Sequence, residues 1–230
     1  AGLHIAGPQA RSLLASVTDA DVSNDALPFL RARKMTIDGN VDAVVARVSF
    51  TGELGYEIYV PWDDQPQAFA ALRQAGNACG LRLAGSHALM SLRLEKSFPS
   101  WGLELAADYY PGESGLARFI AMDKGEFIGR EKLLEMTTRG SRENITTFVV
   151  DAGKADAYSG EPVYCDGELA GYVTSGGYGY RVGQSLALGY LSAEYAGKTD
   201  DFAIEILGDL RPAKVSPLPV YDPTGTRMKS

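Results

Sequence analysis

Apolar and polar residues follow two different periods along the chain, and these periods predict its first elements. Residues 1–8 read as a strand already under way, followed by a turn at a Gly-Pro pair. Apolar residues at three- and four-residue spacing predict a short helix over residues 10–17. Valine-rich residues 41–50 and residues 56–60 predict two strands, joined by a turn that contains two glycines. The first part of the chain therefore mixes strands with helices.

Capping residues delimit three further predicted helices. One runs from Pro66 to about Ala78, with an aspartate before it as its cap and Gly80 after it as the residue that ends it. Ser86 can cap the next helix, and residues 129–139 predict the last one, which ends at a glycine. All three of these predicted helices lie before residue 140.

After residue 140 the pattern changes to short runs rich in valine and tyrosine, separated by turn signals. Asp166-Gly167 and Gly208-Asp209 each stand between two such runs, which is typical of two-residue hairpins. Regularly spaced short strands indicate a small barrel or a sandwich. We therefore predict an α+β fold in two parts, with an α+β domain over residues 1–140 and an all-β domain over residues 141–230.

Composition and charge narrow the classes of function. The 230 residues are 45% hydrophobic and 22% charged, which is ordinary for a globular protein that is long enough to bury a core. The formal net charge of −7 disfavours binding to nucleic acid or to an anionic membrane surface, because both attract a basic field. The chain also has no run of 18 apolar residues. We therefore expect neither nucleic acid nor a membrane as a partner.

The cysteines and histidines do not predict a site. Cys79 and Cys165 are the only cysteines, and they lack the spacing of a zinc site or of a disulfide framework. The only histidines are His4 and His87. We therefore expect no metal site, and we interpret the cysteines as reduced thiols of a cytoplasmic protein, or of a mitochondrial matrix protein if the source is a eukaryote.

The common catalytic motifs are absent from the sequence, which has no nucleophile elbow, phosphate-binding loop or zinc-protease motif. A glycine-rich run over residues 176–180 (GGYGY) lies in the strand-rich part and precedes no predicted helix. It therefore does not fit a dinucleotide-binding loop. We interpret it as an aromatic loop that joins two strands.

The predicted strand after the double-glycine turn is the most informative segment. Because side chains alternate between the faces of a strand, Tyr56, Ile58 and Val60 share one side, and Glu57 and Tyr59 share the other. A carboxylate that faces away from an apolar strand face is as often a solvated surface charge as a ligand-binding group. The pattern by itself leaves both roles open for Glu57.

Seven stretches of the chain together resemble the glycine-cleavage T-protein (aminomethyltransferase) family, and within it the branch of sarcosine and dimethylglycine dehydrogenases. They keep the family's order, and the resemblance as a whole runs from Ala6-Gly7-Pro8 to Val215, which is almost the whole chain. The stretches are residues 50–58 (FTGELGYEI), 91–96 (SLRLEK), 101–104 (WGLE), 111–116 (PGESGL), 127–131 (FIGRE), 171–176 (GYVTSG) and 186–190 (LALGY). One of these matches alone would be weak, but their combination is specific.

The resemblance implies the C-terminal part of a folate-binding domain followed by a small β-barrel. In such enzymes tetrahydrofolate takes up a one-carbon unit from an N-methyl amine after its oxidation to an iminium, and 5,10-methylenetetrahydrofolate forms. The glutamate that holds the pterin falls on Glu57, whose carboxylate can accept hydrogen bonds from adjacent N–H donors. The residues that we expect to contact the folate are Glu57, Phe50, Tyr56, Arg93, Trp101 and Tyr178.

The resemblance assigns no catalytic residue to this chain. The family's catalytic aspartate and the FAD domain of the dehydrogenases both lie in parts that precede the matched stretches. The amine substrate and FAD are therefore expected to bind in a missing N-terminal part, and the isolated chain is expected to be inactive.

Departures from the family pattern leave alternatives open. The leading tyrosine of the first motif is Phe50 here, and Leu89 replaces an arginine of the glycine-cleavage proteins, which favours the dehydrogenase branch. Arg93 is interpreted first as one half of a structural ion pair. Arg118 or Arg181 could meet the anionic glutamyl tail of the folate, but each is interpreted first as a solvated surface charge. The alternative function is a non-catalytic domain of the same fold, either folate-binding or structural.

Overall fold

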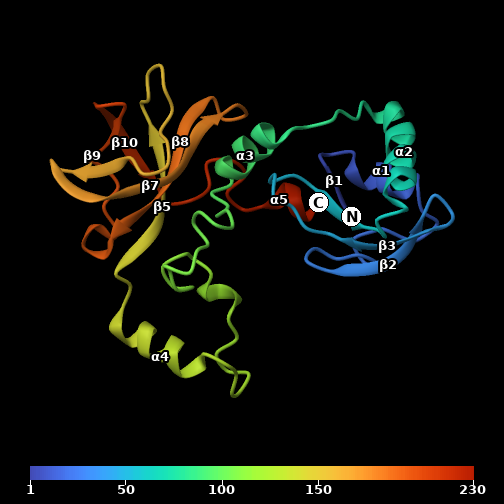
Figure 1. Cartoon of the computed structure of the whole chain (residues 1–230), viewed down its shortest axis with the longest axis horizontal. Helices are drawn as coiled ribbons and strands as arrows, with labels where there is room; N and C mark the ends of the chain where they lie inside the picture. The colour runs from blue at the N-terminus through green and yellow to red at the C-terminus, as the bar shows by residue number, and fades with distance from the viewer. The chain divides into compact units, whose positions relative to one another are not determined.

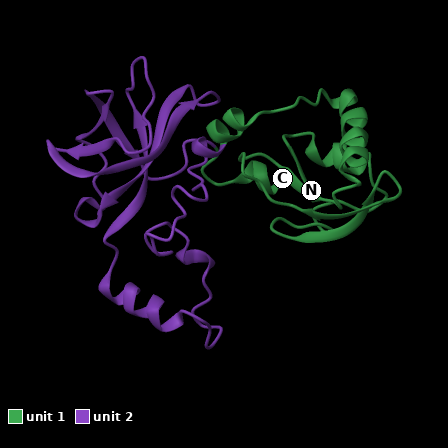
Figure 2. Cartoon of the chain, in the orientation of Figure 1, with its two compact units in different colours: residues 1–92, 222–230 green, residues 93–221 purple.

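A computed structural model describes all 230 residues, Ala1–Ser230, as two compact units. Unit 1 comprises Ala1–Leu92 together with Asp222–Ser230, and unit 2 comprises Arg93–Tyr221 (Figure 2). These units have different bounds from the predicted domains, because residues 93–140 group with the barrel. None of the helices combines the length and the apolar composition that crossing a membrane would require.

Unit 1 contains a four-stranded antiparallel sheet with the strand order β1-β4-β3-β2 (Figure 1). Its strands are β1 (Gly2–Ala6), β2 (Ala32–Ile37), β3 (Val41–Ala46) and β4 (Gly55–Tyr59). Its helical segments are α1 (Ala10–Ala15), α2 (Gln65–Gly76), the 3-10 turn η1 (Asn77–Cys79) and α5 (Thr226–Lys229). Helix α3 (Ser86–Glu95) contains the residue at which the division into units falls.

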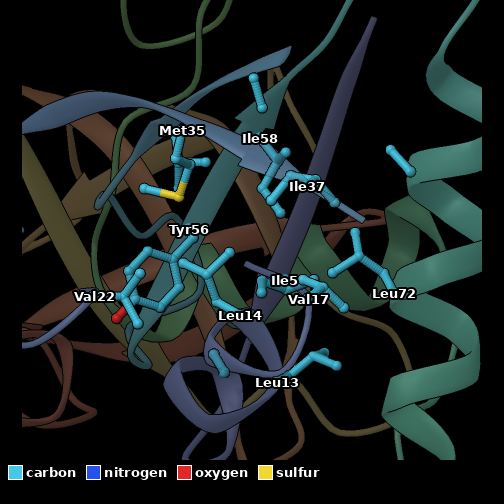
Figure 3. Packing of buried hydrophobic residues seen from close by; sticks show 14 of the residues in the cluster. Ile5, Leu13, Leu14, Val17, Val22, Met35, Ile37, Tyr56, Ile58 and Leu72 are labelled. Atoms are coloured by element: carbon cyan, nitrogen blue, oxygen red, sulfur yellow. The ribbon is translucent and has the colours of Figure 1, made fainter. Parts of the chain in front are cut away.

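One face of this sheet carries the hydrophobic core of unit 1. Ile5 and Ile58 of the sheet pack with Leu13 and Leu14 of α1 and with Leu72 of α2 (Figure 3). The period-two prediction for β4 is confirmed, since Tyr56 and Ile58 are fully buried whereas Tyr59 is exposed. Burial of one face of β4 in this way leaves its opposite face, with Glu57, outside the core.

The elements of unit 1 follow their predicted positions, with two corrections. Helix α2 and η1 end at Gly80, whose φ of 69° is the left-handed conformation expected of a residue that closes a helix. Strand β3 ends at Ala46 and does not extend to residue 50. The sequence reading missed β2 because only Met35 and Ile37 of its residues are buried. Such an edge strand shows too few apolar positions to produce a strand pattern.

Unit 2 contains a closed six-stranded antiparallel barrel, which confirms the predicted all-β barrel. The strand order is β10-β5-β8-β7-β6-β9, so every strand is paired on both sides and no edge is left open. The strands are β5 (Glu143–Val150), β6 (Pro162–Cys165), β7 (Glu168–Gly179), β8 (Gln184–Ser192), β9 (Phe202–Ile206) and β10 (Asp209–Ser216). The other elements are α4 (Arg130–Arg139) and two 3-10 turns, η2 (Ala117–Phe119) and η3 (Ala193–Tyr195).

The two predicted hairpins are present, and one of them turns at a different place. Asp166 and Gly167 join β6 to β7, with φ values of 51° and 85°, as a two-residue turn of this kind requires. The second turn is made by Leu207 and Gly208, because Asp209 already pairs with Ile206. The predicted pair Gly208-Asp209 was therefore wrong by one residue.

The interpretation of the glycine-rich run as a loop is wrong. Residues 176–179 belong to strand β7 and pair with β8, and the connection follows them. The glycines serve close packing, since a Cβ at Gly176 would lie 2.3 Å from the carbonyl oxygen of Ala157. Gly189 in β8 is confined in the same way by the carbonyl oxygen of Tyr172.

We expect Gly176→Ala to lower the free energy of unfolding by about 1–3 kcal/mol, because the new methyl group would force the backbone apart. Gly177→Ala is the matched control. Its Cβ would meet only a side-chain carbon of Leu94, at an ordinary contact distance of 3.8 Å. Urea unfolding of both variants measures the difference, and equal stabilities would contradict the packing role of Gly176.

Candidate functional site

Glu57 lies in the middle of the sheet of unit 1, on the face that is not part of the core. In the sheet register it stands opposite His4 of β1 on one side and Ala46 of β3 on the other. The hydroxyl of Tyr59, two residues along the same strand, donates a short hydrogen bond to Oε2 of Glu57. The other carboxylate oxygen, Oε1, accepts no hydrogen bond within the chain and remains available as an acceptor.

The groups around Glu57 leave its negative charge uncompensated. Burial lowers the pKa of His4 below its ordinary value of 6.5, and this effect outweighs the attraction of the Glu57 carboxylate. His4 is therefore mostly neutral at pH 7. The hydrogen bond to Glu57 raises the pKa of Tyr59 and keeps its hydroxyl protonated. The arrangement can thus bind a ligand that presents N–H donors or a positive charge.

Two other predicted contact residues of unit 1 have different surroundings. Phe50 is half-buried in the bend that precedes the double-glycine turn. Tyr56 is fully buried in the core, and its hydroxyl accepts a hydrogen bond of 3.2 Å from Nε of Arg11. It lies on the opposite face of β4 from Glu57, so in this structure it is a core residue that does not reach the candidate site.

The remaining three predicted contact residues belong to unit 2 and have different surroundings. Arg93 is buried and pairs with Glu104, with 3.5 Å between Nη1 and Oε2, which confirms the interpretation of a structural ion pair. The side chain of Trp101 is 88% exposed. Tyr178 is 40% exposed and packs edge-to-face against Tyr180.

Tyr178 also lines a cavity of unit 2 that has a volume of about 790 Å³. The polar groups of this cavity include Asp156 and Lys214, and also Ser185, whose hydroxyl donates a 2.7 Å hydrogen bond to Asp156. Glu57 is not among its lining residues. The cavity and Glu57 are therefore separate candidate features, one in each unit.

Glu104, from the WGLE stretch, is a carboxylate of unit 2 whose partners come from four different residues. Its side chain is completely buried, and besides Arg93 it accepts hydrogen bonds from Ser100 N at 2.8 Å, from Thr174 Oγ1 at 2.6 Å and from the hydroxyl of Ser175. Thr174 and Ser175 belong to β7, so this carboxylate fixes the segment before the barrel to the barrel itself. Its role is structural, and only the family motif marked it in the sequence.

Glu95, from the SLRLEK stretch, holds the end of the glycine-rich strand. It accepts hydrogen bonds from the backbone N of Arg181 at 2.7 Å and from its Nε at 2.6 Å. The guanidinium of Arg181 also lies over the ring of Tyr221, at 3.6 Å. Arg181 is therefore paired, and its interpretation as a solvated charge is wrong. The sequence pattern could not show this pair, because Glu95 lies 86 positions away in the sequence.

Glu113, from the PGESGL stretch, is the third buried carboxylate. It accepts hydrogen bonds from Arg142 Nε at 3.0 Å and from the backbone N of Tyr110 at 3.2 Å. Burial would raise the pKa of Glu113, but the hydrogen bonds and the charge of Arg142 outweigh it, so the pKa is lowered overall. Three stretches shared with the family thus place glutamates in the scaffold of unit 2.

An antiparallel sheet with a partly exposed glutamate, followed by a closed barrel, defines the chain as a two-unit α+β protein. Comparison with known families gives the same order of parts. The GCVT N-terminal domain matches residues 1–124, and the glycine cleavage T-protein C-terminal barrel domain matches residues 144–222. The first match alone covers more than half of the 230 residues. The chain belongs to the glycine cleavage T-protein family.

Individual relatives confirm the resemblance to the dehydrogenase branch. Human mitochondrial dimethylglycine dehydrogenase is 33% identical over 99% of this chain, and human mitochondrial sarcosine dehydrogenase is 31% identical over 99%. The chain spans only 26% and 25% of their lengths. The glycine cleavage system aminomethyltransferase T of Bartonella henselae has the same fold, with a TM-score of 0.82 and 25% identity over 96% of this chain and 60% of its own.

We expect Glu104→Gln to destabilise the chain by about 3–5 kcal/mol, because the amide keeps the shape but leaves the charge of Arg93 buried without a counter-charge. Glu135→Gln is the matched control. It removes one partner of the Lys132–Glu135 pair, whose side chains are both 60% exposed, and should cost at most about 1 kcal/mol. Urea unfolding measures both, and equal losses would contradict the structural role of Glu104.

The lowered pKa of Glu113 predicts a loss of stability in acid. A carboxyl group whose pKa is lower in the folded state stabilises that state above its unfolded pKa, near the ordinary value of 4.5. This contribution disappears as the pH falls through the lower, folded value. Urea unfolding between pH 7 and pH 3 should show this decline, and Glu113→Gln should make it less steep. An unchanged slope in Glu113→Gln would contradict the assignment.

Proposed function

We propose that this chain is the tetrahydrofolate-binding portion of an enzyme that demethylates small N-methyl amines, similar to sarcosine and dimethylglycine dehydrogenases. The observation that carries the proposal is the carboxylate of Glu57, which lies outside the core in the family's T-G-E-x-G-Y-E motif and keeps one oxygen free. Membership of the glycine cleavage T-protein family supports it.

The surroundings of Glu57 fit the hydrogen-bonding edge of a reduced pterin. That edge presents neighbouring N–H donors, and an ionised carboxylate is a strong acceptor for them. Tyr59 holds Oε2 in place, which orients the group and leaves Oε1 directed away from that bond. When bound, tetrahydrofolate would supply the nucleophilic nitrogen that takes up the one-carbon unit. Tyr59 is therefore a positioning residue in this proposal.

The other expected folate contacts have unequal support. Phe50 is close in sequence to the motif turn, and Trp101 and Tyr178 offer exposed aromatic surface, so these three remain predictions. The side chains of Tyr56 and Arg93 are taken up by the core and by an ion pair, and we leave them out of the proposed site.

The chemistry of amine oxidation is placed outside this chain. Both sheets are antiparallel throughout, and neither contains the parallel βαβ unit that dinucleotide-binding folds use. We propose that FAD, the N-methyl amine and the catalytic aspartate are bound by other parts of a longer protein, as the lengths of the dehydrogenase relatives suggest. For a eukaryotic source we propose a location in the mitochondrial matrix, which the mitochondrial names of these relatives support.

A second candidate function is a structural domain of the same fold without folate binding. It is favoured by the buried glutamates of unit 2, since Glu95, Glu104 and Glu113 all come from family motifs and all make structural ion pairs. The presence of the family motifs in unit 2 is therefore explained by their role in stabilising the fold. Only a binding measurement on Glu57 separates the two functions.

We expect the chain to bind 5-formyltetrahydrofolate, a stable reduced folate, and Glu57→Ala to weaken this binding roughly tenfold to a hundredfold, since each hydrogen bond to the charged group contributes about 1.5–3 kcal/mol. Asp42→Ala is the matched control, because Asp42 is an exposed carboxylate on the neighbouring strand β3. Isothermal titration calorimetry measures the three affinities.

A loss of binding in Glu57→Ala with normal binding in Asp42→Ala supports the folate site. Equal affinities of the two variants would remove Glu57 from it. Absence of binding both in this chain and in a longer chain that contains the preceding domains would favour the structural function.

A further inference from the structure

One of the two thiols of the chain lies against a lysine of the barrel. Cys165 is the last residue of β6, and its side chain is buried with the barrel core. Nζ of Lys198 lies 3.2 Å from its Sγ and also forms a short ion pair with the carboxylate of Asp166. The side chain of Lys198 is 42% exposed, so the lysine extends over the buried thiol from the protein surface. Neither Glu57 nor the cavity beside Tyr178 involves these three residues.

Backbone hydrogen bonds hold the two groups in this position. Lys198 lies in the connection between β8 and β9 (residues 193–201), and its backbone N donates back to the turn η3 at 3.1 Å. The same connection accepts a hydrogen bond from the backbone N of Asp166 through the carbonyl oxygen of Asp201, at 3.2 Å. The thiol of Cys165 and the amine of Lys198 therefore approach each other from two anchored stretches of backbone that are 33 positions apart in the sequence.

The positive charge of Lys198 is stabilised by both of its partners. Hydrogen bonds to Asp166 and, to a smaller extent, to Cys165 raise the pKa of Lys198 above its ordinary value of 10.5. The side chain is therefore an ammonium group at pH 7, and it must lose a proton before its nitrogen can act as a nucleophile. Without the negative charge of Asp166 this pKa would be lower, and a larger fraction of the amine would be neutral.

Cys79, the other free thiol, has different surroundings. It lies in η1 and is more exposed than Cys165. Its Sγ donates to the carbonyl oxygen of Gly76 at 3.4 Å, and no lysine is in hydrogen-bond contact with it. Exposure favours the oxidation of a thiol, so access alone would make Cys79 the more reactive of the two. A product that forms only at Cys165 therefore reports the neighbouring lysine.

We propose that Cys165 and Lys198 form a modification site at which a peroxide joins Sγ to Nζ through a sulfur–nitrogen bond. In the first step the thiol attacks hydrogen peroxide: an S–O bond forms, the O–O bond breaks, and a sulfenic acid and water result. In the second step the amine attacks the sulfenic sulfur: the N–S bond forms, the S–O bond breaks, and water and the ammonium proton leave. The sulfur loses two electrons and one peroxide accepts them, so no further oxidant is needed.

The geometry favours this condensation over further oxidation of the sulfur. At 3.2 Å the amine of Lys198 is already in contact with Sγ, and the flexible four-carbon stem of lysine supplies the remaining movement. Backbone nitrogens condense with sulfenic acids in the same way. Once the sulfur is bonded to nitrogen, no sulfenic acid remains to be converted to the irreversible sulfinic acid.

The link is reversible and joins two parts of the barrel. Two molecules of a thiol reductant restore the thiol and the amine, and they form one disulfide between themselves. While the link is present, it ties the hairpin between β6 and β7 to the connection between β8 and β9. The site is a peroxide-responsive fastener of the barrel, and it does not depend on folate binding by Glu57.

The test treats the whole chain with hydrogen peroxide near neutral pH and identifies the products by mass spectrometry of proteolytic peptides. We expect a linked pair of peptides that contains Cys165 and Lys198 and that lacks the two hydrogen atoms lost in the oxidation. A thiol reductant should separate this pair. Lys198→Arg should remove the link, because it keeps the charge but replaces the amine by a guanidinium that stays protonated. Lys154→Arg, at an exposed lysine of unit 2, is the matched control and should preserve it.

Asp166→Asn tests the role of the ion pair. Asparagine tolerates the left-handed backbone of the hairpin turn, where φ is 51°, but it lacks the charge that stabilises the ammonium group. We expect the link to form about tenfold faster in this variant, because each unit by which the pKa of the lysine falls raises the fraction of neutral amine tenfold. A slower reaction would contradict the role of the carboxylate.

Absence of the linked peptides, with Cys165 recovered as a thiol or as a sulfinic acid, would overturn the proposal and leave only an ion pair between Lys198 and Asp166. A link that contains an additional oxygen atom would overturn the direct sulfur–nitrogen bond. A link from Cys165 that persists in Lys198→Arg would show that another amine is the partner. Cys79 should form no link to a lysine in any of these proteins, and equal linking of both thiols would also contradict the site.

Discussion

The constraint on which unit 2 depends is the burial of the Glu104 carboxylate. A fully buried carboxylate is stable only when its charge and its lone pairs are matched, and here Arg93 supplies the charge while Thr174 and Ser175 of the barrel supply hydrogen bonds. The segment between α3 and the barrel contains no β-strand. Backbone hydrogen bonds of a sheet therefore do not hold it against the barrel. Glu104 gives it a fixed point on β7, and Glu113 gives it another beside the start of β5. This explains why residues 93–140 form one compact unit with the barrel.

In unit 1, by contrast, the carboxylate of Glu57 lies outside the core. The alternation along β4 buries Tyr56 and Ile58 against α1 and α2, and the same geometry places Glu57 and Tyr59 on the open face. A carboxylate on an open sheet face stays ionised with little desolvation cost, and it is accessible to a ligand. Unit 1 thus keeps an available carboxylate on the open face of its sheet, while Arg11 and Arg47 both donate to the main-chain oxygen of Ser230 in the segment that includes α5.

Family motifs do not separate scaffold from site by themselves. Among the glutamates in the stretches that identify this chain as a glycine cleavage T-protein relative, Glu95, Glu104 and Glu113 are buried in ion pairs, whereas Glu57 is partly exposed and keeps a free acceptor. Burial is the property that divides them. A motif residue whose hydrogen-bonding capacity is used up within the chain stabilises the fold, and one with unused capacity is a candidate for binding.

The sequence by itself determined the features that depend on neighbouring residues: the alternation in β4, the end of α2 and η1 at Gly80, and the Asp166-Gly167 hairpin. The strand pattern allowed a barrel or a sandwich, and the family resemblance implied the barrel. Strand geometry left the role of Glu57 open, and the family motif identified it as the candidate group. Only the tertiary structure decided the partners of Arg93, Arg181 and Arg47, the placement of the glycine-rich run inside a strand, and the bounds of the two units. The physical reason is the distance along the sequence over which each interaction acts. Local rules act within a few positions, whereas a buried charge is satisfied by whatever the fold brings to it, and for Glu104 those groups come from 70 residues further along the chain.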